Sequence, residues 1–500
     1  TVFDKISQTL KDYRKVNEIN DNDEIVGILS VDAVSLTPHI KIDGNGKIFG
    51  LTEEIAINQS ELPKLKMLIG EQETLIKKLK SSTINSAYVY YYQPLSPIYR
   101  CFTVFIQPSS SGKACKKQVD LLYKLKEILQ KEKFLVISFA ADGDTGYSKL
   151  VSKTNSYWKT NQRPVLDLSN TLFASDPLHL MKRGRYRLLS HELFMMEHTD
   201  TLIKTSIIQE ILNLPFSVFN NCKITKMQDS LPLKLFTITN FLTLEYAGLY
   251  TECAYFLPFV LLRAALDSKK TDLNERINLL EIAINYLELY KEIYKATPQK
   301  KVGKLKGKKD CILFNNGILN DMMCSLITIN SILNNIKGTV SLNRVGSNPL
   351  EHHFGLLRIR CKFDHRYSNY IKQEAKVNAF HEIEKEIVDN VVIYRRNVFG
   401  ETLFIDEQYK DCQRYSNREV AYSILATFGA KTSKIKFHKE SCPCFVENAY
   451  SQFINLIKSI DGKEESKDKT FILNSKELFP QGSSGAYIRQ RQENSNINRS

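Results

Sequence analysis

Several features that mark other classes of protein are missing from this chain of 500 residues. No stretch reaches about 18 uncharged apolar residues, so no membrane-spanning helix is expected. No secretory signal with an apolar central region opens the chain. The sequence begins at Thr1 rather than Met. We therefore expect a fragment, with an N-terminal module preceding it.

The cysteines lack the spacing of a structural metal site. Ten cysteines are scattered along the chain, and only Cys442 and Cys444 lie close together. Structural zinc sites use two such pairs, or a pair of cysteines with a pair of histidines, so one isolated CxC does not fit. We expect reduced, structural thiols in an intracellular protein. A metal site formed by these two cysteines with His438 is the less favoured alternative.

What the chain does have is length, apolar content and positive charge. Five hundred residues, 43% of them hydrophobic, indicate a folded protein with two or three folding units. Lysine and arginine number 69 against 55 acidic residues, which gives a net charge of +14. This excess favours a polyanionic partner such as a nucleic acid.

The first third of the chain alternates strand and helix patterns. Apolar, aromatic and β-branched runs that end at turn residues predict strands at 24–31, 86–94, 99–108 and 134–141. Asp-Gly and Asn-Gly pairs predict a hairpin at 41–50, and leucines at helical spacing predict an amphipathic helix over 113–133. Together these elements predict an α/β fold with a mixed sheet.

Beyond about residue 180 the patterns become helical. They predict an all-helical block to about 340, then a helix that begins near Glu351. A further helix is expected at 371–389 and a strand at 390–400, and the polar chain from about Lys458 is expected to be partly disordered.

Three carboxylates stand at the ends of predicted elements. Asp32 interrupts an apolar strand, Asp142 ends another, and Glu351 stands at the start of a helix. Two-metal phosphoryl chemistry needs hard oxygen ligands held on rigid elements, so that one ion activates the attacking oxygen and the other stabilises the leaving oxygen. These three residues are therefore candidate ligands of Mg²⁺ or Mn²⁺.

Each carboxylate alone also has a simpler interpretation. Asp32 suits a strand end that faces water, and Asp142-Gly143 suits a tight turn in which Asp144 could replace Asp142 as the acid. Glu351 suits the positive end of a helix dipole. Only the combination of the three favours a metal site.

Four segments that contain these acids resemble the blocks of a known family. LSVDAVSLTP, FAADGDTGYSKL, SDPLHLMKRGRYRLL and NPLEHHFGLLRIR are similar, in order and spacing, to blocks of the P-element and THAP-related DDE transposases, with the hAT group as more distant kin. The matching positions are Asp32, Asp142, Asp176, His179, Leu180, Lys182, Arg185, Glu351, Phe354 and Arg358. The resemblance covers roughly residues 24–400.

The resemblance implies an RNase H-like catalytic domain interrupted by a large helical insertion. The implied units are a first part of the core at 1–180, the insertion at 181–340, closing helices with the third acid at 341–430, and a C-terminal extension, partly disordered, at 431–500. The implied activity is Mg²⁺-dependent hydrolysis of a phosphodiester at transposon ends, followed by 3′-hydroxyl strand transfer into target DNA. A homo-oligomer in the nucleus is implied, with no membrane partner.

The same resemblance implies which residues act. Asp32, Asp142 and Glu351 would bind metal and catalyse. The predicted DNA-binding residues are His179, Lys182, Arg183, Arg185 and Arg358, with Arg187 and Arg360 nearby. For His179 a buried, satisfied histidine is the less favoured alternative, whereas the cationic cluster equally suits a solvated helix face. His352 and His353 diverge by about 100° on a helix, so both cannot face one metal site.

The sequence departs from the family after three of the blocks. DTGYSKL, RGRYRLL and CKFDHRYSNY replace the family's usual continuations, which affects substrate contacts more than the acids. Relatives of the P-element type use a guanine nucleotide, but no nucleotide motif is evident here, so that cofactor is not inferred. Three alternatives stay open: a domesticated DNA-binding or chromatin protein without catalysis, a nuclease without strand transfer, and a helical scaffold with a basic surface.

Overall fold

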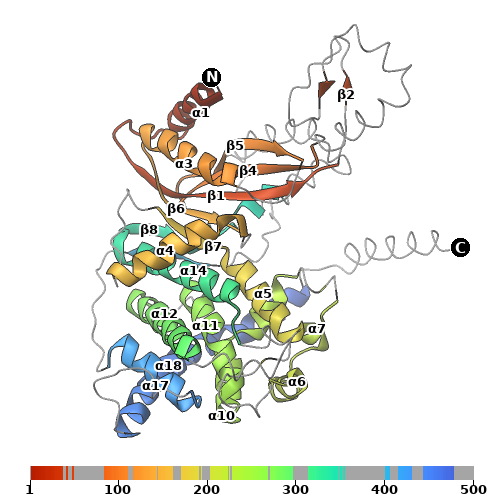
Figure 1. Ribbon diagram of the computed structural model, residues 1–500, viewed down its shortest axis with the longest axis vertical. Coiled ribbons are helices and arrows are strands. Elements are labelled where there is room, and N and C mark those ends of the chain that lie inside the picture. Colours follow the sequence, from red (N-terminus) through yellow and green to blue (C-terminus); the bar gives the residue numbers. More distant parts are fainter. Residues whose placement is uncertain are drawn as a thin grey trace, which may run out of the picture.

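The computed structural model describes most of the chain, and Figure 1 shows a sheet across one half of the molecule and helices filling the other half. The described residues are 2–37, 41–42, 48–49, 84–110, 116–142, 145–161, 171–190, 193, 203–222, 225, 228–267, 271–296, 313–347, 349–351, 353–354, 400–405, 415–430 and 443–477.

A five-stranded mixed sheet forms the first half, in the order β5-β4-β1-β6-β7. Its strands are β1 (Ile25–Ser35), β4 (Ser86–Pro94), β5 (Phe102–Ser109), β6 (Phe134–Ala141) and β7 (Leu172–Ser175). The pairs β5–β4 and β4–β1 are antiparallel, and the pairs β1–β6 and β6–β7 are parallel. This arrangement is compatible with an RNase H-like fold. Two shorter antiparallel pairs join β2 (Lys41–Ile42) to β3 (Ile48–Phe49), and β8 (Gly338–Ser341) to β9 (Thr402–Ile405).

The centre of the sheet is buried on both faces. Every residue of β4 is buried, which is why its sequence, SAYVYYYQP, is apolar and aromatic without alternation. The Tyr92 hydroxyl reaches the neighbouring strand β1 and donates to the Ile25 carbonyl at 2.6 Å. Gly27 makes room for that ring, because a Cβ at this position would lie 2.5 Å from Tyr92 Cζ.

Helices cover the two faces of the sheet. On one face pack α1 (Val2–Val16) and α3 (Lys116–Lys131), where apolar side chains such as Leu125 and Leu129 meet Phe134 in one cluster. Leu150 and Val151, from the helix that follows β6, belong to the same cluster. The helices other than α1 and α3 lie near β7 and beyond it (Figure 1). They are α4 (Ser148–Asn161), α5 (Pro177–Ser190), α6 (Thr205–Leu212), α7 (Phe216–Phe219), α9 (Ser230–Leu235), α10 (Ile238–Tyr246), α11 (Tyr250–Asp267), α12 (Leu273–Ala296), α14 (Asn316–Asn335), α17 (Asn417–Thr427) and α18 (Pro443–Glu477).

The helical block shares a core with the sheet. One cluster of buried apolar residues contains Ile28, Ile137 and Ala174 from the strands together with the interior of α11, α12 and α14. The helices expected between 181 and 340 are thus present among the described residues, but their core continues that of the sheet. The division of the chain into four units stays a prediction.

Helix α14 closes the edge of the sheet. Its Thr328 hydroxyl donates to the Phe173 carbonyl of β7 at 3.0 Å, and its Ser325 hydroxyl donates to the Ser175 carbonyl at 2.6 Å. From the other side, the Thr154 hydroxyl of α4 accepts from the Phe173 amide at 2.9 Å. An open edge strand would expose unpaired backbone groups, and these side chains satisfy them. The contacts also fix α14 beside the end of β7.

The strand and helix predictions for the first third of the chain are confirmed with shifted ends. β1 does not stop before Asp32 but continues to Ser35. The helix expected at 371–389 lies outside the described residues, as does the strand expected at 390–400 except for its last residue, Gly400.

The C-terminal part corrects two expectations. α18 extends past Lys458, where a disordered tail was expected, to Glu477, and its Phe453 and Ile457 are buried in the shared core. Reduced thiols were expected, but Cys444, at the start of this helix, is disulfide-bonded, whereas Cys101, Cys222, Cys253 and Cys324 are free thiols.

Among the described helices, none combines the length and apolar character needed to cross a membrane.

Candidate active site

Three aspartates stand in one row across neighbouring strands, Asp32 inside β1 and the other two directly after β6 and β7. In the parallel register Val31 pairs with Ala141, and Ala141 pairs with Ser175. The next residues of these strands are Asp32, Asp142 and Asp176. The Asp176 amide donates to the Ala141 carbonyl at 3.1 Å, which keeps this row in register. Parallel strands bring their carboxyl ends to the same edge of a sheet, and this is why the first two predicted acids meet.

A separate segment brings Glu351 to the same edge. Leu350 and Phe354 are one helical turn apart, and both are buried in a cluster with Val34, Val89 and other residues of β1 and β4. This packing fixes the helical turn that contains Glu351 against the end of the sheet. The third predicted acid therefore joins the first two across more than 200 residues of sequence.

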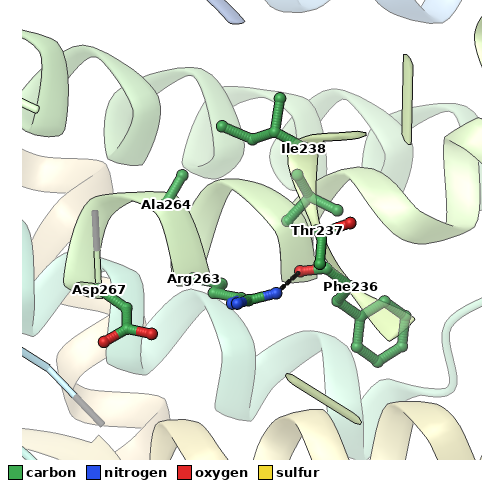
Figure 2. A pocket seen from close by; sticks show the side chains of 7 residues that line it. Phe236, Thr237, Ile238, Arg263, Ala264 and Asp267 are labelled. Carbon is green, nitrogen blue, oxygen red and sulfur yellow. Dashed lines mark hydrogen bonds between the residues drawn. The ribbon is translucent and has the colours of Figure 1, made fainter. Parts of the chain in front are cut away.

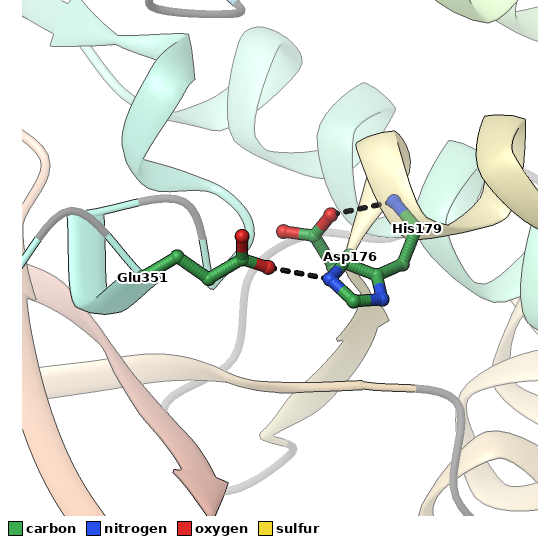
Figure 3. A group of neighbouring side chains, drawn as sticks. All are labelled: Asp176, His179 and Glu351. Carbon is green, nitrogen blue, oxygen red and sulfur yellow. Dashed lines mark hydrogen bonds and ion pairs between the residues drawn. The ribbon is translucent and has the colours of Figure 1, made fainter. Parts of the chain in front are cut away.

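His179, in the first turn of α5, lies between two of the acids. Its Nδ1 is 3.2 Å from Asp142 Oδ1, and its Nε2 is 2.5 Å from Glu351 Oε1. Figure 3 shows the second contact, with Glu351 reaching across to the imidazole and Asp176 beside it. The carboxylates of Asp142 and Glu351 are thus one imidazole ring apart. These two acids therefore lie in one place rather than in separate regions of the protein.

The acids share one electrostatic field. Burial raises the pKa of Asp32 to about 7, and the negative charges of Asp142 and Glu351 add to the increase. For His179, burial acts to lower the pKa, but hydrogen bonds to Asp142 and Glu351 outweigh it and raise the pKa to about 11. The protonated imidazole donates from both ring nitrogens and partly neutralises the carboxylates around it.

The donor set fits a hard divalent cation. Carboxylate oxygens are the preferred protein ligands of Mg²⁺ and Mn²⁺, and crowding of like charges is what a bound cation relieves. Asp32, Asp142 and Glu351 would hold such an ion. Asp176, His179 and Glu351 also offer three ligand atoms within 4.8 Å of one another. The oxygens of Asp176, however, already accept from the His179 amide, the Ser347 amide and the Ser347 hydroxyl.

The cations predicted on α5 divide between two faces. Lys182 and Arg183 follow His179 by three and four residues and therefore share its face of the helix. Lys182 Nζ pairs with Asp229 at 3.0 Å, and Arg183 pairs with Asp321 of α14 at 2.6 Å. Both side chains are partly exposed beside the acids. Their role in DNA binding stays a prediction.

Arg185 points the other way, into the protein. It follows His179 by six residues, which places it on the opposite side of the helix. It is only 2% exposed and donates to the carbonyls of Val218 and Asn220 at 2.7 Å each. The prediction of a DNA contact is therefore at odds with the position of Arg185, whose guanidinium is fully used in holding α7 against α5. Arg187 is also buried, and Arg358 and Arg360 lie outside the described residues.

This position makes a prediction about stability. Arg185→Lys should lower the free energy of unfolding by about 1–3 kcal/mol, because a lysine cannot reach all the carbonyls that the guanidinium satisfies. Lys182→Ala, which removes one ion pair to the partly exposed Asp229, should change it by less. Urea unfolding of both variants beside the wild type provides the measurement. A stability for Arg185→Lys equal to that of the wild type would contradict the buried role.

Sequence reasoning did not identify two groups that complete the site. Ser347 donates hydrogen bonds to Asp176, and Asp321 of α14 forms an ion pair with Arg183. For Asp176 a signal was available, because Asp-Pro before a helical pattern marks a helix N-terminus. For Ser347 and Asp321 the contacts are long-range, and nothing in their local sequence indicates them.

A small pocket lies within the helical block, away from the acids. Its lining residues are Phe236, Thr237, Ile238, Val260, Arg263, Ala264 and Asp267, and its volume is about 30 Å³. Figure 2 shows Arg263 donating to the backbone of the neighbouring turn from inside this pocket. The space suits a water molecule rather than a nucleotide.

Comparisons of the sequence and of the structure with known proteins give one distant structural likeness and no family. No family model matches the sequence, and no curated protein matches it significantly. Among solved structures, the Drosophila P element transposase strand transfer complex is similar, with 13% sequence identity and a TM-score of 0.45 over 75% of this chain and 81% of that chain. A likeness at this level establishes neither a family nor an activity, so the function has to be argued from the site.

Proposed function

We propose that this protein is a metal-dependent DNA transposase that hydrolyses a phosphodiester at a transposon end. The 3′-hydroxyl released there then attacks a phosphodiester of a second DNA and displaces the 3′-oxygen of that strand. The observation that supports this most is the convergence of Asp32, Asp142 and Glu351, from three distant segments, at one edge of a mixed sheet. The four sequence blocks that contain these residues resemble those of the P-element group. The net charge of +14 favours a nucleic acid as the substrate.

The three acids would hold Mg²⁺ or Mn²⁺, which supplies a Lewis acid for the attacking and leaving oxygens. The protein groups contribute position and charge. β1 and β6 hold two carboxylates in register, and the turn at Glu351 closes the site from the other side. His179 and Lys182 place positive charge beside the acids, where a DNA phosphate would be brought in. A nuclear homo-oligomer acting on paired transposon ends belongs to the same proposal.

The experiment uses the purified chain and DNA that it selects itself. Duplexes enriched by binding from a random library would be offered as labelled donor ends with a free 3′-hydroxyl, together with a supercoiled plasmid as target. In Mg²⁺ or Mn²⁺ we expect donor joined to plasmid, detected as labelled plasmid on a gel. EDTA should abolish these products, and Ca²⁺, which binds carboxylates with a looser geometry, should not replace Mg²⁺.

Each other outcome selects another function. Nicked plasmid without joined donor would identify a nuclease that lacks strand transfer. Duplex binding that persists while no product forms in any metal would identify a DNA-binding protein without catalysis. Absence of both binding and products would leave a helical scaffold with a basic surface and overturn the proposal.

A further inference from the structure

We propose that Asp176 is a positioning residue that holds Glu351 against His179, and that it is not itself a metal ligand. This inference rests on the proposed function for its effect on activity. Asp176 is 1% exposed, directly after β7 and directly before Pro177, the first residue of α5. Its backbone is fixed in the sheet, because its amide donates to the Ala141 carbonyl at 3.1 Å.

One oxygen of Asp176 holds the turn of His179. Oδ1 accepts from the His179 amide at 2.8 Å, which is the hydrogen bond of a helix N-cap to the third residue of the helix. The Asp176 carbonyl accepts from the Leu180 amide at 3.0 Å, so the same residue also begins the helical ladder. The orientation of His179 at the start of α5 therefore depends on this carboxylate.

The other oxygen holds the turn of Glu351. Oδ2 accepts from the Ser347 amide at 2.7 Å and from the Ser347 hydroxyl at 3.1 Å, across 171 residues of sequence. The Ser347 carbonyl in turn accepts from the Glu351 amide at 2.9 Å, which begins the helical turn of the third acid. At Gly346 a Cβ would collide with Asp176 Oδ2, so the chain can approach the carboxylate this closely only because residue 346 is a glycine.

A single buried carboxylate thus sets the distance between two residues that touch each other. The three hydrogen bonds that the Asp176 carboxylate accepts leave little capacity for a metal ion. This holds although one of its oxygens lies within 4.8 Å of ligand atoms of His179 and Glu351. Groups that orient metal ligands without binding the metal typically contribute 10- to 100-fold to activity. We expect Asp176 to act in this way, through Ser347 on one side and His179 on the other.

The activity test compares Asp176 with Asp142, which stands beside it in the row and is a proposed ligand. Asp176→Asn and Ser347→Ala should lower the rate of joining by about 10- to 100-fold with little change in the Mg²⁺ concentration that gives half the maximal rate. Gly346→Ala, which pushes the turn away from the carboxylate, should have the same effect. The double variant Asp176→Asn/Ser347→Ala should join DNA no more slowly than Asp176→Asn, because both changes weaken the same contact between residues 176 and 347.

Metal rescue separates a ligand from a positioning residue. In Asp142→Cys the thiolate can bind Mn²⁺ or Cd²⁺, so these ions should restore part of the activity that is lost in Mg²⁺. Asp176→Cys should keep a similarly reduced rate in Mg²⁺, Mn²⁺ and Cd²⁺. Rescue of Asp176→Cys to the level of Asp142→Cys would overturn the proposal, as would normal activity in both Ser347→Ala and Gly346→Ala.

A second measurement does not depend on activity. In hydrogen–deuterium exchange, Asp176→Asn and Ser347→Ala should speed exchange at the Ser347 and Glu351 amides while exchange in β6 stays unchanged. If the wild type joins no DNA at all, the proposed function fails, and this exchange result alone decides whether Asp176 holds the turn. Unchanged exchange at both amides in both variants would overturn the positioning role even in an active enzyme.

Discussion

Asp142→Asn and Glu351→Gln should each reduce DNA joining in Mg²⁺ by on the order of 10³-fold while binding of duplex DNA is kept. A metal ion at such a site supplies several kcal/mol of stabilisation to the transition state, and each 1.4 kcal/mol is a factor of ten in rate. Asparagine and glutamine keep the size of the side chains but remove the charge that holds the ion. The rate of joining at saturating DNA is the measurement.

The two variants should behave as parts of one unit. Because both residues flank His179 and share one field, the double variant should be little worse than either single variant. Affinity for DNA should be equal to that of the wild type or somewhat higher, since each change removes a negative charge near the phosphate. Gel-shift titration at fixed salt concentration measures this second quantity.

The matched control is Glu252→Gln in α11. Glu252 is also a buried carboxyl, 6% exposed, and burial raises its pKa, but it is not a member of the site. This variant should join DNA at the rate of the wild type. Joining by Glu351→Gln at a rate within tenfold of the wild type would contradict a catalytic role for the third acid, and loss of joining in Glu252→Gln would show that any buried carboxyl is sensitive.

Much of the sheet could be predicted because its signals are local. The apolar and aromatic runs of β1, β4 and β6 fill positions that are mostly buried on both faces, and β5 is half-buried, so period and composition were sufficient. The end of β1 could not be placed, because Asp32 resembles a strand end. Pairing with β4 carries the strand three residues further, and no local pattern records that pairing.

The helical block shows where local reasoning stops. Helical periodicity identified the helices, yet it gives no information on which apolar faces meet. Ile28 and Ala174 of the sheet share their core with α11 and α14, so a boundary near residue 180 divides packing that is continuous. The burial of Phe453 and Ile457 in α18 depends in the same way on contacts with distant helices rather than on the polar composition of the C-terminal part.

The site was predicted in composition but not in detail. Asp32, Asp142, His179 and Glu351 do come together, and their order in the sequence was the signal. Arg185 was assigned to DNA binding from the family resemblance and from the charge of its block, without regard to the face of the helix. Arg185 follows His179 by six residues, which is about two-thirds of a turn beyond one full helical turn. This spacing alone puts the two side chains on different faces of α5, and the face of Arg185 is the one that packs into the protein.

Replacing Asp32 with asparagine should stabilise the protein in metal-free buffer at pH 8, although the change removes a proposed ligand. Burial, with Asp142 and Glu351 close by, raises the pKa of this carboxyl from 3.8 in the unfolded chain to about 7 in the folded protein. At pH 8 the group is ionised in both states, but in the folded state the charge is unfavourable. Since a tenfold change in proton affinity equals about 1.4 kcal/mol, the cost is on the order of 2 to 4 kcal/mol.

The sign of the pH dependence follows from proton uptake. Between pH 7 and about pH 4 the folded protein binds a proton at Asp32 that the unfolded chain does not, so the wild type gains stability as the pH falls through this range. The amide introduced by Asp32→Asn resembles the protonated acid at every pH. The difference in unfolding midpoint between Asp32→Asn and the wild type, in EDTA, should therefore be largest at pH 8 and disappear near pH 4. Asp23→Asn, at an exposed aspartate, is the control and should show no difference at either pH.

Divalent metal should reverse the order of the two proteins. A cation that binds the folded state raises the unfolding midpoint by mass action, and its affinity depends on ionised carboxylates. Saturating Mg²⁺ at pH 8 should therefore raise the midpoint of the wild type and leave that of Asp32→Asn nearly unchanged. Equal midpoints of the two proteins in EDTA at pH 8 would show that Asp32 does not share the field of Asp142 and Glu351. The burial of Asp32, together with the charges of Asp142 and Glu351, destabilises the metal-free site, and the proposed cation would offset the charge that these carboxylates share.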